Sequence, residues 1–323
     1  MPASAPGETT MTPALIGLDW GTSALRAYLL AADGTVVDGR TAPLGILKVV
    51  DAEFEAVFED VAGPWLGAHG ALPVVASGMI GSRQGWVEAP YVACPAGAED
   101  LARGLVTHLT GNGRSVRFVP GLSIADRDGV PDVMRGEETQ IVGDLAGRRG
   151  DADGVYLLPG THSKWAAVEG GRITWFATFI TGELFAVLCD HSILGRLMRG
   201  DGDDRERFRQ GLAYAAPDPG GRGGLLRRLF SARTLALFDR LPATGVRSYL
   251  SGLLIGAEIH EARVGAEVAG ADPGRVTLIG EARLAALYAE ALAHQGIAAT
   301  IAGDGVTARG LAAIAGLAGL TGG

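Results

Sequence analysis

Cysteine and lysine are both scarce in this sequence. Its 323 residues include two cysteines, Cys94 and Cys189, which are too few for a disulfide framework and are not spaced as metal ligands. We expect both cysteines to be reduced and to lie in the core. Of the 28 lysine and arginine residues, only Lys48 and Lys164 are lysines, so the position of each lysine is informative.

Positive charge and long apolar runs are also lacking. The formal net charge is −8 and the isoelectric point is near 5.3, with no basic block, so we expect neither nucleic acid nor an anionic membrane as a partner. A local basic pocket for an anionic small molecule is still compatible with this charge. No stretch reaches the roughly 18 apolar residues of a membrane span, and residues 1–13 have no basic residue and no apolar core. The sequence therefore predicts a cytoplasmic protein with a frayed N-terminus.

Two common nucleotide-binding motifs are absent. The sequence contains no G-x-x-x-x-G-K-[ST] run, which excludes a P-loop of that type. It also has no G-x-G-x-x-G turn that leads into a helix with an acidic residue at the spacing of a dinucleotide fold. Nicotinamide chemistry is therefore unsupported.

The length and composition indicate about two domains of an ordinary globular protein. Apolar residues make up 47% and charged residues 20%, and the 50 glycines suggest many tight turns. Strand and helix patterns alternate, which favours an α/β fold. A hinge is predicted at 148–154, where a polar run lies between apolar segments. Predicted strands lie at 14–19, 24–30, 35–38, 73–77, 115–119, 155–158, 164–168, 173–176, 275–279 and 297–301. Predicted helices lie at 53–68, 98–109, 136–145, 183–198, 224–240, 247–264 and 282–294, and at the C-terminus.

One pattern occurs in both halves of the chain. In the first half, Asp19-Trp20-Gly21-Thr22-Ser23 interrupts two strands, and in the second half Gly160-Thr161-His162-Ser163-Lys164 does the same. Backbone N–H groups and short hydroxyls of such turns can approach phosphate oxygens, and the carboxylate can hold a hydrated Mg²⁺. The alternative is a plain polar hairpin tip, and the short match leaves both duplication and chance open. Two facing hairpins could clamp a triphosphate, with Lys164 supplying positive charge.

A third cluster, at 133–140, contains Arg135 beside the paired carboxylates Glu137 and Glu138. Acidic residues at a helix start interact favourably with the helix dipole, so a capping role is the alternative to a functional one. Functionally, one carboxylate could accept the proton of an attacking hydroxyl, and Arg135 could pair with a substrate carboxylate. Successive helix residues point about 100° apart, so we expect only one glutamate to face the site.

A fourth cluster, at 77–86, is a glycine-rich loop with hydroxyl, guanidinium and indole donors. These donors would suit a polyol or a sugar acid, and an aromatic plane could cover its C–H faces. A solvent loop is the alternative. The candidate substrate-binding residues here are Gly78, Met79, Ser82, Arg83 and Trp86.

Together these segments resemble the 2-dehydro-3-deoxygalactonokinase family, which comprises sugar-acid kinases of the actin, Hsp70 and hexokinase superfamily. The resemblance extends in order over most of the chain from about residue 15. The stretches that carry it are LIGLDWGTSALRAYL, SGMIGSRQGWVEAPY, VMRGEETQIVG, LLPGTHSKW, TGELFAVLCDHSILG and YLSGLLIGAEI. The MRGEETQ and PGTHSKW runs are much more specific than the Asp-x-Gly-Thr pattern.

The resemblance implies a two-domain actin-like ATPase fold of the ribonuclease H-like α/β class. In this fold each half has a mixed five-stranded sheet, and ATP binds in a cleft between the halves. It implies domains at 1–148 and 149–323, and the last helix can pack back on the first domain. It further implies that ATP, with Mg²⁺, phosphorylates the 6-hydroxyl of 2-dehydro-3-deoxy-D-galactonate. A homodimer is compatible with the family.

The resemblance also implies roles for individual residues. Asp19 would hold the metal, and the candidate catalytic residues are Asp19, Glu137, Glu138 and Lys164. Nucleotide contacts would come from Gly21, Thr22, Ser23, Gly160, Thr161, His162, Ser163, Gly280 and Gly303. The sugar acid would contact Gly78, Met79, Ser82, Arg83, Trp86 and Arg135.

The sequence departs from the family pattern at three places. A smaller polar residue is expected at Arg83, and the 279–283 segment lacks the glycine-hydroxyl run expected near adenosine. The second phosphate loop has no acidic residue, which directs the general-base role towards Asp19, Glu137 or Glu138. Among these three we favour Glu137.

Three other functions are compatible with parts of the pattern. A kinase for a different sugar acid or sugar would use the same fold. An ATP-dependent switch of the actin and Hsp70 type would need a partner-binding appendage, for which 323 residues leave little room. A sugar-responsive repressor would need a basic DNA-reading segment, which the N-terminus lacks.

Overall fold

The computed structural model describes residues 11–148, 153–200, 203–216 and 223–322. The chain forms two compact units. Unit 1 comprises Met1–Asp151 with Gly303–Gly323, and unit 2 comprises Ala152–Ala302. Much of the predicted hinge, 149–152, and of the predicted frayed terminus, 1–10, lies outside the described residues. The last segment of the chain thus belongs to unit 1.

Unit 1 is built on a six-stranded sheet with the strand order β3-β2-β1-β4-β7-β6. Its strands are β1 (Leu15–Trp20), β2 (Leu25–Leu30), β3 (Val36–Ala42), β4 (Val74–Ser77), β6 (Val106–Leu109) and β7 (Ser115–Phe118). Strands β1, β4 and β7 are parallel, whereas β2, β3 and β6 are antiparallel to their neighbours. Because β1 lies inside the sheet and is buried on both faces, its sequence is almost continuously apolar.

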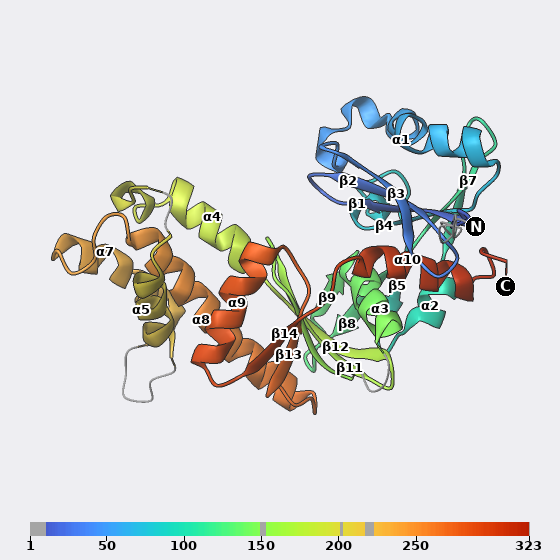
Figure 1. The fold of residues 1–323 in the computed structure, drawn as a ribbon. Coiled ribbons are helices and arrows are strands. Elements are labelled where there is room, and N and C mark those ends of the chain that lie inside the picture. The colour runs from blue at the N-terminus through green and yellow to red at the C-terminus, as the bar shows by residue number, and fades with distance from the viewer. Residues whose placement is uncertain (1–10, 149–152, 201–202, 217–222, 323) are drawn as a thin grey trace, which may run out of the picture. The chain divides into compact units, whose positions relative to one another are not determined.

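Helices cover both faces of this sheet (Figure 1). Helix α1 (Phe54–His69) buries Phe58 and Trp65 against Trp20 and Phe118 of the strands. Helix α10 (Val306–Leu317) contacts β1, β2 and β4 and packs along α3 (Glu137–Gly147). A smaller sheet, with the order β5-β8-β9, leads into α3. It consists of β5 (Tyr91–Ala93), β8 (Gly121–Ala125) and β9 (Pro131–Met134), and α2 (Ala98–Arg103) follows β5.

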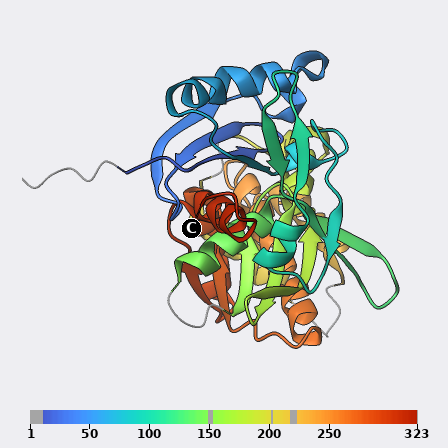
Figure 2. The same cartoon turned by 90° about the vertical axis from the view of Figure 1, so that its right-hand side faces the viewer.

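Helices α3 and α10 approach each other through glycine, and Figure 2 shows them side by side. A Cβ atom at Gly143 would lie 1.7 Å from the carbonyl oxygen of Val306, and one at Gly310 would lie 1.9 Å from that of Thr139. In unit 2, Gly211 and Gly252 allow the same close approach of α5 to α8. The close packing of both helix pairs therefore depends on glycine, which has no side chain, at these contact positions.

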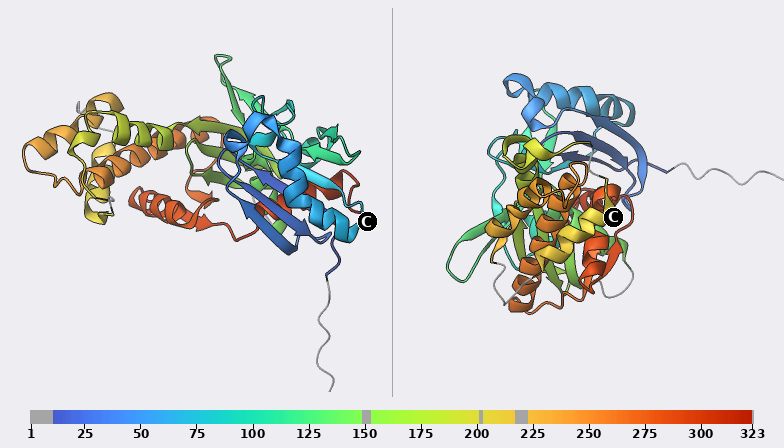
Figure 3. Two further views of the ribbon diagram at one scale, coloured as in Figure 1. Left: turned by 90° about the horizontal axis from the view of Figure 1, so that it is seen from above. Right: turned by 90° about the vertical axis from the view of Figure 1, so that its left-hand side faces the viewer.

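Unit 2 contains a five-stranded sheet with the order β12-β11-β10-β13-β14. The strands are β10 (Gly154–Leu158), β11 (Ser163–Glu169), β12 (Arg172–Phe179), β13 (Arg275–Leu278) and β14 (Ala298–Ile301). This order repeats β3-β2-β1-β4-β7 of unit 1, with an antiparallel hairpin and meander followed by two parallel strands. The helices of unit 2, visible in Figure 3, are α4 (Thr181–His191), α5 (Arg205–Ala215), α6 (Leu225–Leu229), α7 (Ser231–Leu237), α8 (Val246–Val268) and α9 (Ala282–His294).

Several sequence predictions about these elements were wrong, and no strand was expected at β5, β8 or β9. The helix expected at 98–109 ends at Arg103, because Gly104 follows it and 106–109 pairs with β7 through a tight turn. That strand, β6, makes the sheet of unit 1 six-stranded where five strands were expected. Helix α5 was missed because its arginines obscure the apolar stripe formed by Phe208 and Leu212. No helix in the described part of the chain is both long enough and apolar enough to cross a membrane.

The packing of α3 on α10 predicts opposite effects for the same substitution at two helical glycines. Gly143→Ala should lower the free energy of unfolding by about 2–3 kcal/mol, because the added methyl group overlaps Val306. Gly67→Ala, at an exposed site in α1 with open space around it, should instead raise it by up to about 1 kcal/mol. Urea unfolding followed by circular dichroism measures both changes. Equal effects at the two sites would contradict the close packing.

Candidate functional site

In unit 1, three segments that carry candidate residues meet at one end of the sheet. Asp19 and Ser77 lie side by side at the ends of the parallel strands β1 and β4. Gly78 has a φ of +91°, and a Cβ atom there would lie 2.9 Å from the carbonyl oxygen of Trp20 and 3.5 Å from Oδ1 of Asp19. Gly136, with a φ of +108°, would place a Cβ atom 3.2 Å from the Cα atom of Gly78. Asp19, the 77–86 loop and the start of α3 are therefore in direct proximity.

Asp19 is largely buried and faces Arg26 across the β1–β2 hairpin. The Arg26 Nη1 atom lies 3.3 Å from Asp19 Oδ2. Burial raises the pKa of the Asp19 carboxyl, and the charge and hydrogen bond of Arg26 partly oppose that rise. Arg26 was not among the candidates. The hairpin register could have identified Arg26, because Asp19 and Arg26 are directly paired across the β1–β2 hairpin.

The first loop is a tight turn held from one side. The N–H of Gly21 donates to the carbonyl of Ala24, and the hydroxyl-bearing residues Thr22 and Ser23 are exposed. The N–H of Ile46 donates to the carbonyl of Gly21 at 3.0 Å. Gly45 lies so close that a Cβ atom there would be 2.2 Å from the carbonyl oxygen of Thr22. The loop thus has a fixed backbone and two outward-facing hydroxyl residues.

The two neighbouring glutamates of α3 have different environments. Glu138 is fully buried, and its carboxyl accepts hydrogen bonds from the Gly136 N–H at 2.7 and 2.9 Å and from the Thr139 hydroxyl at 3.0 Å. Burial, with a smaller contribution from the charge of Glu137, raises the pKa of Glu138 to about 8. Glu137 is only half-buried and accepts a hydrogen bond from the Arg135 N–H. Glu138 therefore holds the turn before α3, and Glu137 is the more accessible carboxylate.

Arg135 is buried with spare hydrogen-bonding capacity. Its Nη2 atom donates to the carbonyl of Ala89 at 2.7 Å, and its guanidinium lies over the ring of Tyr91, 4.4 Å from the centroid. Its Nε and Nη1 atoms are buried without a hydrogen-bond partner among the described residues. The same is true of the hydroxyls of Ser77 and Ser82. Buried donors of this kind normally have a partner, so this cluster is suited to an anionic, hydroxylated ligand.

Three other candidates of the 77–86 loop are either exposed or packed against the core. Arg83 is exposed and makes no hydrogen bond or ion pair with any described residue. Trp86 packs against the rings of Trp20, Phe58, His108 and Phe118, so its faces are used by the core. Met79 also packs against the core. Tyr91, which was not a candidate, is the aromatic residue that lies against Arg135.

In unit 2, the second loop borders a cavity of about 300 Å³. Gly160 and Thr161 line it together with residues of α4, α8 and α9. The first turn of α4 fixes the loop, because Glu183 donates its N–H to the carbonyl of Thr161 and its carboxylate lies 2.6 Å from His162 Nε2. A Cβ atom at Gly182 would lie 2.3 Å from the carbonyl oxygen of Gly160. Loop and helix start thus form one rigid wall.

Ser163 and Lys164 point to opposite faces of β11, as neighbours on a strand do. Ser163 is fully buried, and its hydroxyl shares a hydrogen bond with the Tyr288 hydroxyl beneath the cavity. Lys164 is also buried, and its ammonium donates to the Thr178 hydroxyl at 2.8 Å. The Ser163 hydroxyl therefore supports the loop from below, and Lys164 is held as a fixed charge on the other face.

A buried carboxylate that was not a candidate lies beneath the second loop. Glu258 of α8 accepts hydrogen bonds from Trp165 Nε1 at 2.9 Å and from the Tyr288 hydroxyl at 2.7 Å. Hydrogen bonds with Ser163 and Thr181 add to these, and all four lower the pKa of Glu258, although burial raises it overall. A single carboxylate within the apolar run YLSGLLIGAEI was the signal that could have identified it.

The two remaining glycine candidates lie apart. Gly280 is next to the second loop, because a Cβ atom there would be 3.4 Å from the ring of Pro159. The Glu281 carboxylate then caps α9 by accepting from two backbone N–H groups. A second cavity of about 320 Å³ at this helix start shares Phe185 and Leu284 with the first one. Gly303 is exposed and is the first residue of the C-terminal segment of unit 1.

The fit to Mg²⁺ depends on Asp19. No group of three or more His, Cys, Asp or Glu side chains within the described ranges is arranged to hold a metal. Mg²⁺ in phosphoryl-transfer enzymes usually keeps several waters and binds through one or two carboxylates and the substrate phosphates. A single strand-end carboxylate next to a glycine turn fits that pattern.

The environment of Glu138 predicts a pH-dependent stability. Because its pKa is about 8 in the folded chain and near 4.5 in the unfolded chain, the folded state binds more protons between these values. The contribution of Glu138 is therefore complete below pH 4.5 and is lost as the pH rises through about 8, at up to about 1.4 kcal/mol per pH unit. Urea unfolding between pH 5 and 8 should show this slope in the wild type and in Glu137→Gln. It should be reduced in Glu138→Gln, and an unchanged slope there would contradict a protonated Glu138.

Comparison with known proteins places this geometry in a family. The model of the family described as 2-keto-3-deoxy-galactonokinase matches residues 19–314. The 2-dehydro-3-deoxygalactonokinase of Escherichia coli (strain K12) is 33% identical over 306 residues, covering 94% of this chain and 98% of that protein. A probable 2-dehydro-3-deoxygalactonokinase of Rhizobium meliloti (strain 1021), DgoK1, is 36% identical over 285 residues, covering 87% and 89%.

Solved structures agree with this assignment. The crystal structure of a candidate 2-dehydro-3-deoxygalactonokinase from Sinorhizobium meliloti matches with a TM-score of 0.82 at 34% identity, covering 93% of this chain and 98% of that one. Component A of the (R)-2-hydroxyglutaryl-CoA dehydratase of Acidaminococcus fermentans matches with a TM-score of 0.50 at 11% identity, over 93% and 95%. The latter likeness concerns the fold alone, which is the actin-like ATPase fold that the sequence predicted. The chain belongs to the 2-keto-3-deoxy-galactonokinase family.

Proposed function

We propose that this protein transfers the γ-phosphate of ATP to the 6-hydroxyl of 2-dehydro-3-deoxy-D-galactonate. The products are ADP and 2-dehydro-3-deoxy-6-phosphogalactonate. The observation that carries the proposal for an acidic substrate is the buried Arg135, whose Nε and Nη1 atoms have no partner among the described residues. The family and its curated relatives support the reaction.

Arg135 binds the substrate carboxylate in this proposal. A guanidinium already fixed by Ala89 and Tyr91 loses little freedom when it binds a planar carboxylate. The Ser77 and Ser82 hydroxyls, also buried without partners in the described structure, bind hydroxyl groups of the sugar chain. Arg83 and Trp86 have no direct role in this arrangement, because one is exposed and the other is packed in the core.

Glu137 acts as the general base and Asp19 as the ligand of hydrated Mg²⁺. The substrate oxygen forms a bond to the γ-phosphorus, its proton passes to the Glu137 carboxylate, and the bond to the ADP oxygen breaks. Bound Mg²⁺ would neutralise charge on the phosphates. Glu138 is a positioning residue, because its carboxyl is buried, carries a proton at neutral pH and is occupied by Gly136 and Thr139.

Unit 2 binds the nucleotide. The backbone of Gly160, Thr161 and His162 lies beside phosphate oxygens, and the 300 Å³ cavity, which is mostly apolar, receives the nucleoside. Gly280 lies next to the second loop, and Phe185 and Leu284 line the cavity. We also propose that Thr22 and Ser23 of unit 1 contact phosphate oxygens. Lys164 contributes as a fixed positive charge, since its ammonium is held by Thr178.

We also propose an oligomeric state and a cellular location. A homodimer is supported by large exposed apolar side chains around α6 and α7, namely Leu226, Phe230, Leu237 and Phe238. ATP is available in the cytoplasm, where we place the reaction. A sugar acid is then the only partner that the reaction needs besides ATP and Mg²⁺.

An ADP-release assay over a panel of 2-keto-3-deoxy sugar acids tests the function. We expect turnover with the galactonate-type acid and little with neutral sugars. Arg135→Gln should lower kcat/KM for the sugar acid about 100-fold, mainly through KM, because a charge-assisted pair is lost. Arg83→Gln, in the neighbouring loop, is the matched control and should behave as wild type. Equal activity on neutral sugars would refute the substrate, and ATPase activity independent of any sugar would favour an actin-like switch.

The Glu258 cluster predicts a selective effect on the nucleotide. Glu258→Gln replaces one acceptor oxygen by a donor, so the hydrogen bonds from Trp165 and Tyr288 cannot both be kept. KM for ATP should rise about tenfold while KM for the sugar acid changes little, because the loop that loses support lies in unit 2. Tyr288→Phe, which removes one of these bonds, should have a smaller effect. Steady-state kinetics on variants with native circular dichroism spectra distinguish this result from an equal rise in both constants, which would contradict it.

A further inference from the structure

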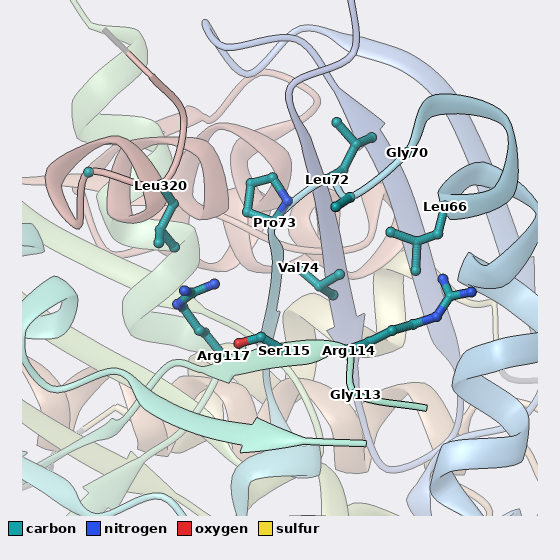
Figure 4. Close-up of a pocket in the computed structure, with 12 residues that line it drawn as sticks. Leu66, Gly70, Leu72, Pro73, Val74, Gly113, Arg114, Ser115, Arg117 and Leu320 are labelled. Atoms are coloured by element: carbon teal, nitrogen blue, oxygen red, sulfur yellow. The ribbon is translucent and has the colours of Figure 1, made fainter. Parts of the chain in front are cut away.

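Unit 1 has a cavity at the end of its sheet where β4 and β7 begin (Figure 4). Asp19 lies at the opposite end, where β1 and β4 finish. Its volume is about 760 Å³. The cavity is bordered by the C-terminal end of α1 with the turn before β4, by the start of β7, and by residues 319–320 after α10. Neither the family assignment nor the proposed reaction uses it.

Two arginines line this cavity, and one of them is unpaired among the described residues. Arg117 of β7 is half-buried and makes no side-chain hydrogen bond or ion pair with any described residue. Arg114 lies beside Glu59, with 3.2 Å between its Nε atom and Glu59 Oε1. Figure 4 shows the Arg117 guanidinium next to Leu320 and that of Arg114 below Leu66, with Ser115 between them. The Arg117 guanidinium is thus available to a ligand, whereas Glu59 balances the charge of Arg114.

The rest of the wall is apolar. Leu66, Leu72, Pro73, Val74 and Leu320 line the cavity above the arginines. Burial of apolar ligand surface there contributes roughly 25 cal/mol per Å². A volume of this size suits a small organic molecule. The lining therefore fits a ligand with an anionic group at one end and an apolar part at the other.

The cavity is separate from the site at Asp19. Strand β4 begins at Val74, in the cavity wall, and ends at Ser77, beside Asp19. Arg117 pairs with Val75, two residues before Ser77, and neither Asp19 nor Arg135 lines the cavity. A metabolite-sized ligand at Arg117 would therefore not displace a sugar acid at Arg135.

We propose that this cavity is a second binding site for a small organic anion, one with a carboxylate or phosphate group and an apolar body. The anionic group pairs with Arg117 and accepts a hydrogen bond from the Ser115 hydroxyl. The apolar body packs against Leu72, Pro73 and Leu320. A ligand bound here would not compete with the sugar acid at Arg135.

Binding of phenyl phosphate, phenylacetate and benzyl alcohol to the purified protein, measured by saturation-transfer NMR and calorimetry, tests this site. We expect the two anions to bind and the neutral alcohol to bind much more weakly. Arg117→Gln should weaken binding of the anions about tenfold or more, because a charge-assisted interaction is lost. Arg127→Gln, at an arginine exposed elsewhere on unit 1, should bind like wild type.

Arg135→Gln separates this site from the one at Asp19. If the anions occupy the proposed cavity, this variant binds them like wild type. Loss of binding in Arg135→Gln with retention in Arg117→Gln would place the probes in the sugar-acid site and overturn the proposal. Absence of anion binding by the wild type would overturn it too. Thermal unfolding of each variant shows that the changes do not arise from loss of fold.

Discussion

The site in unit 1 depends on the close approach of two glycine backbones. Gly78 and Gly136 both have positive φ angles, and each stands where a Cβ atom would press on the other segment or on the end of β1. Their contact brings Asp19, the 77–86 loop and the start of α3 together. An L-residue at either position would be strained in its backbone and would push these segments apart. The chemistry proposed for Asp19, Arg135 and Glu137 requires this approach.

Each unit places a buried glutamate behind its functional loop. Glu138 holds the Gly136 turn in unit 1, and Glu258 joins Trp165 and Tyr288 in unit 2. A buried carboxyl is costly unless its hydrogen bonds are satisfied, and satisfied ones fix the groups that donate to them. We interpret both residues as parts of rigid walls. In the proposed reaction, Glu137 and the exposed loop backbone are the groups that contact the ligands.

The sequence predicted most strands and helices within a few residues, because their apolar patterns are local. The hairpin loops at Gly21 and Gly160 were recognised for the same reason, and the strand order shows that the two halves share one topology. Helix α5 was missed because charge hides its apolar stripe. Strand β6, which exists only by pairing with β7, and the short strands β5, β8 and β9 were missed as well. Substrate contacts of Arg83 and Trp86 stay predictions. In the fold Arg83 is exposed, and Trp86 packs against core rings.

Residue patterns along the chain were enough to predict the α/β class, the two glycine loops, the acidic start of α3 and the kinase family. Which of Glu137 and Glu138 is buried, what surrounds Arg135, and that Ser163 faces Tyr288 while Lys164 faces Thr178 are known only from the folded chain. The physical reason is that adjacent residues carry the same local signal. Their burial, and hence their pKa and hydrogen bonds, is set by segments such as β5, α9 and α10 that are distant in the sequence.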